Sequence, residues 1–352
     1  MGLKRLSISG FRCFDRVDLE PTTGVNVVVG PNASGKTSLL EAIFLLGRGR
    51  SFRAARKQAM IRETATELQI VGKLGDGRSM GIEVGKDGWT ARAGGEPITQ
   101  LAELAGLLPV QVMDPEIHRL VQEGPGERRR YIDWATFHVE HEFLETWRKY
   151  QRALRQRNAA LRSRQPDPMI QAWEQALGES GATLDRFRAE AVAQLAAPAS
   201  AAAERLLGTP LGLEYRPGQP SDTSLASALA EHRERDRKAG TTQIGPHRAE
   251  LSLRLDGHKA RGWVSRGQQK LVAAALVLGQ AQLLAPYWAD RGILLVDDPA
   301  AELDADRCER LLSVIAEMPF QVFVTSLDPR SLPGMVPDAM FHVEQGKAAR
   351  MV

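Results

Sequence analysis

The sequence predicts one α/β domain that is split by an inserted helical lobe. Three observations support this fold class. Short strand-like runs separated by turn signals fill the first third of the chain. Helical periodicity replaces them from about Pro115. Strand-like runs alternating with helices return in the last third, so the two ends of the chain share one architecture.

The N-terminal third is predicted to contain five strands and one apolar helix. The strand-like runs are "LKRLSI", "DRVDLE", "VNVVV", "TELQIVGKL" and "RSMGIEV", with Gly-rich turns at "GDG" and "KDG". A helix is expected after Lys36, because apolar residues cover most of its face, and Gly47 is placed to end it. A helix so apolar should lie beneath a sheet.

The middle of the chain is predicted to be helical. Trp147, Tyr150, Leu154 and Leu161 recur at three- and four-residue steps or multiples of them, which indicates one buried stripe. The Ala-rich stretch 189–207 is either two helices or one kinked helix, because Pro198 interrupts it.

Strand signals return at "AELSLRLDG" and "QVFVTS", with helices expected over 268–284 and 306–318. Ile293–Val296 is continuously apolar, as in a central parallel strand covered on both faces. We therefore assign residues 1–114 and 241–352 to the split α/β lobe and 115–240 to the inserted helical lobe.

Composition indicates a soluble cytoplasmic protein without a membrane partner. The 46 Lys and Arg nearly balance the 43 Asp and Glu, so a nucleic-acid contact must come from local patches. Two cysteines, Cys13 and Cys308, exclude a disulfide framework and fit a reducing compartment. The N-terminus has no secretory pattern, and the longest apolar segment, 271–285, is shorter than the roughly 20 residues that span a bilayer.

A phosphate-binding loop follows the third predicted strand. Gly30 to Thr37 matches G-x-x-x-x-G-K-[ST] between a strand and a helix, which is the context that this pattern requires. Lys36 is expected to reach the β- and γ-phosphates, and the Thr37 hydroxyl to ligate Mg²⁺. The alternative is a Gly-rich turn ahead of a core helix. The residues expected to contact the nucleotide are Gly30, Pro31, Asn32, Ala33, Ser34, Gly35, Lys36, Thr37 and Ser38.

Two aspartates end the buried strand "ILLV". Asp297 is placed to hold Mg²⁺, and Asp298 to orient or deprotonate an attacking water. Taken alone, the pair would indicate a solvated turn, but a phosphate loop needs such an acid beside it.

A second helix start, in "WVSRGQQK", also offers outward-facing amides. Ser265 is available as a cap, with Gly267 and Gln268 in the first turn. Because Lys36 already serves the phosphates of its own subunit, this helix start suits the nucleotide of another subunit. The alternative is an ordinary capping box.

These motifs, in order, resemble an ATP-binding-cassette (ABC) ATPase head of the SMC type. The set is "GPNASGKTS", "PVQVMDPE", "VSRGQQK", "ILLVDDPAAELD" and "VFVTS". Within that class the chain is similar to the RecF family, through "SGFRCF", "GRGRSFR", "GPGERRRYIDW" and "GPHRAEL". The resemblance implies an ABC-type, SMC-like P-loop head with a mixed sheet and an inserted helical lobe.

The resemblance also implies roles for further residues. Gln111 matches the glutamine that senses the metal and the attacking water. Ser265, Gly267 and Gln268 match the signature motif that closes over the partner's γ-phosphate. Asp304 matches an aspartate that couples the two sites of a dimer, and Arg12 matches an arginine near the nucleotide.

Three positions depart from related patterns. Asp298 stands where transporters carry glutamate, although an aspartate pair is typical of RecF itself. Thr325 stands at the switch position in place of histidine. Glu250 replaces a common aspartate in "GPHRAEL". There His247 and Arg248 either touch the nucleotide or brace the sheet, and we favour bracing.

Basic residues on the predicted middle helix are candidates for DNA contact. No acidic residue lies between Thr146 and Pro166, and the run could neutralise several backbone phosphates. The alternative is a solvated basic face. Two rival patches are Arg128 to Arg130 and the cluster Arg48, Arg50, Arg53, Arg56 and Lys57. The DNA-binding candidates are Arg148, Lys149, Arg152 and Arg155, within a run that also includes Arg157, Arg162 and Arg164.

The function implied is an ATP-gated clamp on duplex or gapped DNA. ATP and Mg²⁺ would join two copies, and weak, DNA-stimulated hydrolysis would release them. The family resemblance implies a recombination mediator that acts with RecO and RecR to load RecA. Three alternatives stay open: a monomeric small-molecule kinase, a transporter ATPase with a membrane partner, and a structural SMC-like head.

Overall fold

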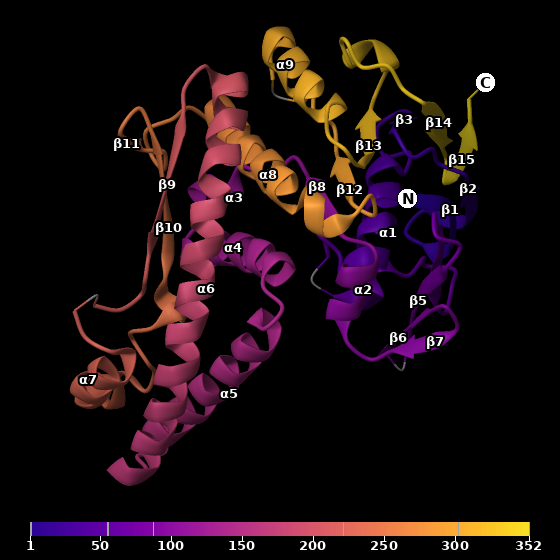
Figure 1. The fold of residues 1–352 in the computed structure, drawn as a ribbon. Helices are drawn as coiled ribbons and strands as arrows, with labels where there is room; N and C mark the ends of the chain where they lie inside the picture. Colours follow the sequence, from indigo (N-terminus) through magenta and orange to yellow (C-terminus); the bar gives the residue numbers. More distant parts are fainter. Residues whose placement is uncertain (1, 55, 87, 221, 302, 352) are drawn as a thin grey trace. The chain divides into compact units, whose positions relative to one another are not determined.

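The computed structural model describes residues 2–54, 56–86, 88–220, 222–301 and 303–351 (Figure 1). The chain forms two compact units. Residues 1–117 and 274–352 make the first, and residues 118–273 make the second. The boundary near the C-terminal side falls inside helix α8 (Arg266–Trp288).

A six-stranded mixed sheet forms the centre of the first unit. Its order is β15-β14-β3-β13-β12-β8, and only the edge strand β15 is antiparallel to its neighbour. Every residue of the three middle strands is buried, which explains their continuous apolar runs. The strands are β3 (Val25–Val29), β8 (Val110–Met113), β12 (Ile293–Val296), β13 (Gln321–Ser326), β14 (Ala339–Glu344) and β15 (Lys347–Arg350).

A second, antiparallel sheet in the same unit has the order β2-β1-β4-β5-β6-β7. Buried and exposed residues alternate along β4, so one face of this sheet meets the core. The strands are β1 (Leu3–Phe11), β2 (Phe14–Leu19), β4 (Leu68–Leu74), β5 (Ser79–Gly85), β6 (Gly88–Ala93) and β7 (Glu96–Ile98).

Helix α1 (Lys36–Arg48) shares one hydrophobic cluster with residues of both sheets. It continues past Gly47, where the sequence predicted its end, and stops at Gly49 in the left-handed conformation. Glycine is needed at position 47 for a different reason, because a Cβ there would lie 2.5 Å from the carbonyl oxygen of Leu108. The other helices wholly in this unit are α2 (Leu101–Leu107) and α9 (Ala305–Ala316).

Helix α8 is longer than the apolar segment seen in the sequence. It has 23 residues, and its most apolar window reaches a mean hydropathy of 1.4, enough for a membrane span by length and composition. However, 72% of that window is buried in the protein, which is the behaviour of a core helix.

Among the residues that the structure describes, the second unit combines five helices and the start of α8 with a three-stranded antiparallel sheet of order β11-β10-β9. Its helices are α3 (Arg119–Gln122), α4 (Pro125–Val139), α5 (Phe143–Arg162), α6 (Asp167–Leu207) and α7 (Leu225–Ala239). Its strands are β9 (Leu211–Arg216), β10 (Glu250–Leu255) and β11 (His258–Lys259). Helix α6 is one continuous 41-residue helix with Pro198 inside it, which decides between the two alternatives left by the sequence.

The second unit extends beyond residue 240, the boundary that the sequence suggested. The reason is strand pairing, since β10 pairs along its length with β9, so the segment "AELSLRL" joins this unit instead of the mixed sheet. A partner strand elsewhere in the chain leaves no local signal.

Candidate nucleotide-binding site

The loop between β3 and α1 has the backbone of a phosphate cradle. Gly30 and Gly35 both have positive φ, at 156° and 118°. A Cβ at Gly30 would lie 2.1 Å from the carbonyl oxygen of Val343, and one at Gly35 would lie 2.7 Å from Cys13 Sγ. Both positions therefore require glycine. Ser34 adds a buried hydroxyl that has no hydrogen-bond partner among the described residues.

Lys36 is the first residue of α1 and is buried. Its ammonium group donates to the carbonyl oxygens of Gly30 at 2.7 Å and Pro31 at 2.9 Å. Burial lowers the pKa of Lys36, and the nearby carboxylates of Asp298 and Asp297 oppose that shift. The ammonium has three N–H donors, so one is left for a phosphate oxygen as far as the described residues show.

Thr37 and Asp297, 260 residues apart in sequence, are brought into contact. The Thr37 hydroxyl donates to Asp297 Oδ1 at 3.0 Å, where α1 begins and β12 has just ended. A hydroxyl and a carboxylate oxygen are hard ligands of the kind that Mg²⁺ prefers, and each comes from a rigid element. The donor set therefore fits the metal that the sequence predicted.

Thr325, near the end of β13, completes this cluster. Its hydroxyl donates to Asp297 Oδ1 at 2.7 Å and accepts from the backbone N–H of Asp298 at 2.9 Å. Asp298 has a φ of 50°, an uncommon conformation for a residue other than glycine. Thr325 thus fixes both the Asp297 carboxylate and the turn that carries Asp298. In the sequence, this position stands out only because it carries threonine in place of histidine.

Gln111 and Arg12 are committed to neighbouring side chains. Gln111, on β8, donates to Gln280 Oε1 at 2.6 Å, while its own Oε1 is buried with no partner among the described residues. Arg12 makes two hydrogen bonds to the fully buried Glu41 of α1, at 2.9 and 2.7 Å. Both contacts brace the fold, and their roles toward a nucleotide stay predictions.

The start of α8 is a capping box. The Ser265 N–H donates to the Gln268 side chain at 2.9 Å, and the Gln268 N–H donates to the Ser265 hydroxyl at 3.3 Å. Ser265 is exposed and Gly267 partly exposed. Asp304 caps α9 by accepting from the Arg307 N–H at 2.9 Å, and it is also exposed. Ser265 and Asp304 therefore lie at the protein surface.

His247 and Arg248 both make hydrogen bonds within the second unit. His247 Nε2 lies 3.0 Å from the Thr242 carbonyl oxygen and must donate to it, so Nδ1 accepts from the Tyr150 hydroxyl at 2.6 Å. Arg248 donates to Gln243 at 2.8 Å. Neither residue contributes to the phosphate cradle through these contacts.

The basic run on α5 divides into two sets. Arg148, Lys149, Arg152 and Arg155 are exposed, although Lys149 pairs with Glu145 at 2.7 Å. Arg157 is fully buried and pairs with Asp236 and Glu174, so it is not available to DNA. Arg128 of the first rival patch is also buried, bonded to Glu250 at 2.7 Å, which removes it as a DNA contact.

Known proteins resemble this chain along its whole length. Residues 2–350 match the family described as the RecF/RecN/SMC N terminal domain. A protein named "DNA replication and repair protein RecF" from Thioalkalivibrio sulfidiphilus is 42% identical, covering 98% of each chain. The protein of the same name from Pseudomonas aeruginosa strain LESB58 is 38% identical, covering 99% of this chain and 98% of its own.

Solved structures confirm the predicted fold class. The recombination mediator protein RecF of the RecFOR pathway, in its ATP form, has a TM-score of 0.89 at 24% identity, covering 100% of this chain and 98% of its own. An SMC head bound to the C-winged helix domain of ScpA has a TM-score of 0.61 at 17% identity, covering 100% and 97%. The architecture is therefore an SMC-like ABC head.

Proposed function

This chain belongs to the RecF family, and we propose that it is an ATP-dependent DNA-binding recombination mediator whose two copies close on shared ATP. The observation that carries the proposal is the contact of Thr37 with Asp297 beside the glycine cradle and Lys36. The names of the relatives support a role in DNA repair.

The cradle residues suit ATP. Backbone N–H groups of the loop and the start of α1 would surround the phosphates, and Lys36 would exchange loop carbonyls for β- and γ-phosphate oxygens. Mg²⁺, held by Thr37 and Asp297, would neutralise charge on the phosphates. Asp298, on its left-handed turn fixed by Thr325, would orient the attacking water and accept its proton. Gln111 could assist if its unpartnered oxygen faces that water.

ATP would also join two protomers. Ser265 and Gly267 are accessible at the start of α8, and amides at a helix start favour an anion. In the dimer this helix start would cap the γ-phosphate held by the other protomer, with Asp304 coupling the two sites. Hydrolysis then separates the copies, so a slow ATPase acts as a timer.

Duplex or gapped DNA would contact the exposed basic residues of α5. Such contacts to backbone phosphates do not depend on the base sequence, and the binding affinity that they supply decreases as the salt concentration rises. By family membership the protein would act in the cytoplasm, on nucleoid DNA, with RecO and RecR to load RecA.

Sedimentation with ATP and Mg²⁺ tests the shared site. We expect an ATP-induced dimer for the wild type and monomers for Lys36→Ala and Ser265→Arg. Lys36→Ala should lose nucleotide binding, because the ammonium is removed, whereas Ser265→Arg should keep it, because its own cradle is intact. A Ser265→Arg protein that dimerises like the wild type would refute the shared site.

Measuring duplex affinity over a range of salt concentrations tests whether α5 contacts DNA. Replacing Arg152 and Arg155 by Gln should weaken duplex binding and reduce the slope of log K against log salt by about 0.9 for each phosphate that is no longer neutralised. Arg186→Gln on α6 is a matched control, because it is exposed and already paired with Glu190. An unchanged slope in the α5 variant would exclude this face.

A further inference from the structure

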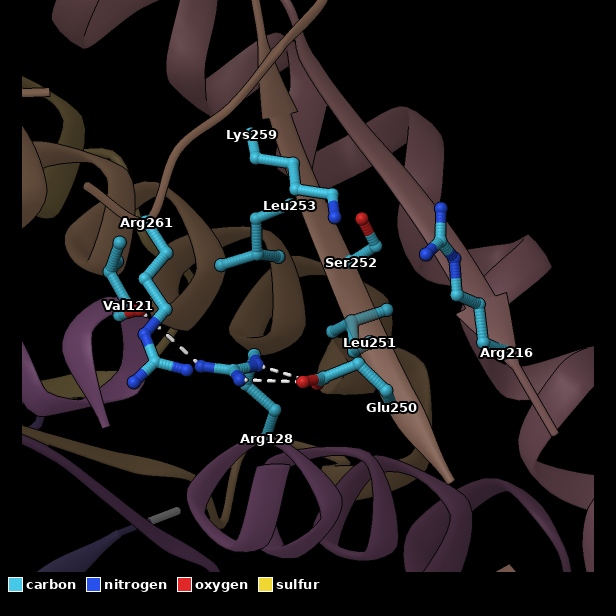
Figure 2. Close-up of a pocket in the computed structure, with 9 residues that line it drawn as sticks. All are labelled: Val121, Arg128, Arg216, Glu250, Leu251, Ser252, Leu253, Lys259 and Arg261. Atoms are coloured by element: carbon cyan, nitrogen blue, oxygen red, sulfur yellow. Dashed lines mark hydrogen bonds and ion pairs between the residues drawn. The ribbon is translucent and has the colours of Figure 1, made fainter. Parts of the chain in front are cut away.

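A pocket of about 160 Å³ lies within the second unit, on one face of its three-stranded sheet (Figure 2). Glu250 and Ser252 project from β10 two residues apart and so share a face, and Arg216 is paired in register with Glu250. Lys259 on β11, Arg261 just after it, and Arg128 of α4 complete the polar lining. The lining thus contains four cations and one carboxylate.

The Glu250 carboxylate is already paired with a cation of the lining. Glu250 accepts two hydrogen bonds from Arg128, at 2.7 and 2.8 Å, and Arg128 also donates to carbonyl oxygens that include that of Glu123, at 2.8 Å. Arg128 is buried and Glu250 is partly exposed, and their ion pair forms one wall of the pocket. Arg216 pairs with Glu214, which lies on the surface and also meets Arg254, so that pair is worth little.

Lys259 and Arg261 have no ion pair or hydrogen bond with the side chains that the structure describes, and both are exposed. In Figure 2 the Lys259 ammonium extends toward the Ser252 hydroxyl, while Arg261 reaches toward the end of the pocket that holds Arg128. Like charges gathered around a concave site repel one another unless an anion lies between them.

We propose that this pocket binds one phosphodiester group of duplex DNA, with Lys259 and Arg261 as the charged contacts and Ser252 as a hydroxyl donor. A guanidinium fork, an ammonium and a hydroxyl are the donors that typically meet backbone phosphates. The volume suits a single phosphate group, and none of the described residues that line the pocket is aromatic and could stack on a base. The inference rests on the proposed DNA-binding function and adds a second contact to that of α5.

The test compares two double variants in duplex binding across a range of KCl, with ATP and Mg²⁺. Lys259→Gln with Arg261→Gln removes the free charges of the pocket. Arg235→Gln with Lys238→Gln removes the same charge from exposed positions on α7, in the same unit. The pocket variant should lose about 0.9 from the salt slope, or roughly eightfold in affinity at about 0.1 M salt. The α7 variant should keep the wild-type slope, and ATP-induced dimerisation should persist in both.

The outcomes separate this inference from the proposed function. If the wild type binds duplex and the pocket variant has the slope of the α7 control, the pocket inference is wrong while DNA binding stands. If orthophosphate binds the wild type but not the pocket variant, and duplex slopes are equal, the pocket takes a free anion and the inference is again wrong. A wild type that does not bind duplex would overturn both.

Discussion

The hydroxyl group of Thr325 lies between the two aspartates that follow β12. It donates to one carboxylate and accepts from the backbone of the next residue, and the side chain is completely buried. Thr325 therefore holds the Asp297 carboxylate and the Asp298 backbone in place through a single hydroxyl group.

Thr325→Val removes the hydroxyl group at almost constant volume. We expect single-turnover ATP hydrolysis to fall by roughly 10- to 100-fold, because a residue that orients metal-binding groups is lost. The dissociation constant of ATP should change little, since the cradle is intact. Thr325→Ser should restore most of the rate, because it keeps the hydroxyl.

A matched control is Thr136→Val on α4. Thr136 is also fully buried, and its hydroxyl donates to the Ile132 carbonyl oxygen at 2.8 Å. It makes this bond within its own helix, so it does not position the two aspartates. If both valine variants lower the hydrolysis rate equally, a general loss of stability explains the effect and Thr325 has no special role.

Arg157 shows why single residues in a charge run escape sequence analysis. It lies three residues after Leu154 and four before Leu161, so it sits on the buried stripe that the sequence correctly predicted. Its acidic partners, Glu174 and Asp236, lie 17 and 79 residues away in the sequence. Periodicity placed Arg157 on the buried face of its helix. Its acidic partners could not be identified in the same way, because only the folded chain brings them next to it.

At the scale of elements, His247 joins helix α5 to the turn that precedes β10. The imidazole accepts from Tyr150 and donates to the Thr242 carbonyl oxygen, which requires the neutral ring. Burial is the largest cause that lowers the pKa of His247, and the positive charges of Arg248 and Arg129 add to it. The folded protein therefore takes up this proton at lower pH than the unfolded chain does.

The free energy of unfolding should consequently fall as the pH drops below about 6.5, the ordinary pKa of histidine. Below that pH the unfolded state binds a proton at this histidine more readily than the folded state does, so acid favours unfolding. The contribution of this one group cannot exceed about 1.4 kcal/mol per pH unit. His247→Gln should flatten the dependence, measured by urea denaturation between pH 5 and 7.5, a range chosen to span the ordinary pKa.

His141→Gln is the control for this experiment, because His141 is exposed and lies in the same unit. It should keep the wild-type pH dependence. If His247→Gln also keeps it, the imidazole does not couple α5 to this turn through its protonation state.

Elements with local signals were predictable, and those that depend on distant pairing were not. The capping box at Ser265 and the central strand β12 follow from residues within a few positions of each other. The three-stranded sheet does not, because β9 and β10 are separated by α7 and its flanking loops. Lys259 and Arg261 were missed for the same reason, although their place just before Ser265 could have drawn attention to them.

At the scale of the whole molecule, we propose that the nucleotide site is divided between two copies of the chain. The cradle with Lys36, Thr37 and Asp297 lies in one unit, and Ser265 begins a helix from the other. The P-loop pattern and the aspartate pair could be recognised from sequence, because their chemistry needs fixed residue types. The sharing of the site between protomers rests on family membership and on the accessible cap of α8.

The most direct test of this sharing is the ATPase rate per protomer, measured over a wide range of protein concentration. A site completed by a partner's Ser265 predicts that the rate per protomer rises with concentration and then reaches a plateau as dimers fill. The Ser265→Arg protein should stay at the low rate at every concentration. A rate per protomer that is constant down to the lowest concentration, and unaffected by Ser265→Arg, would contradict the account.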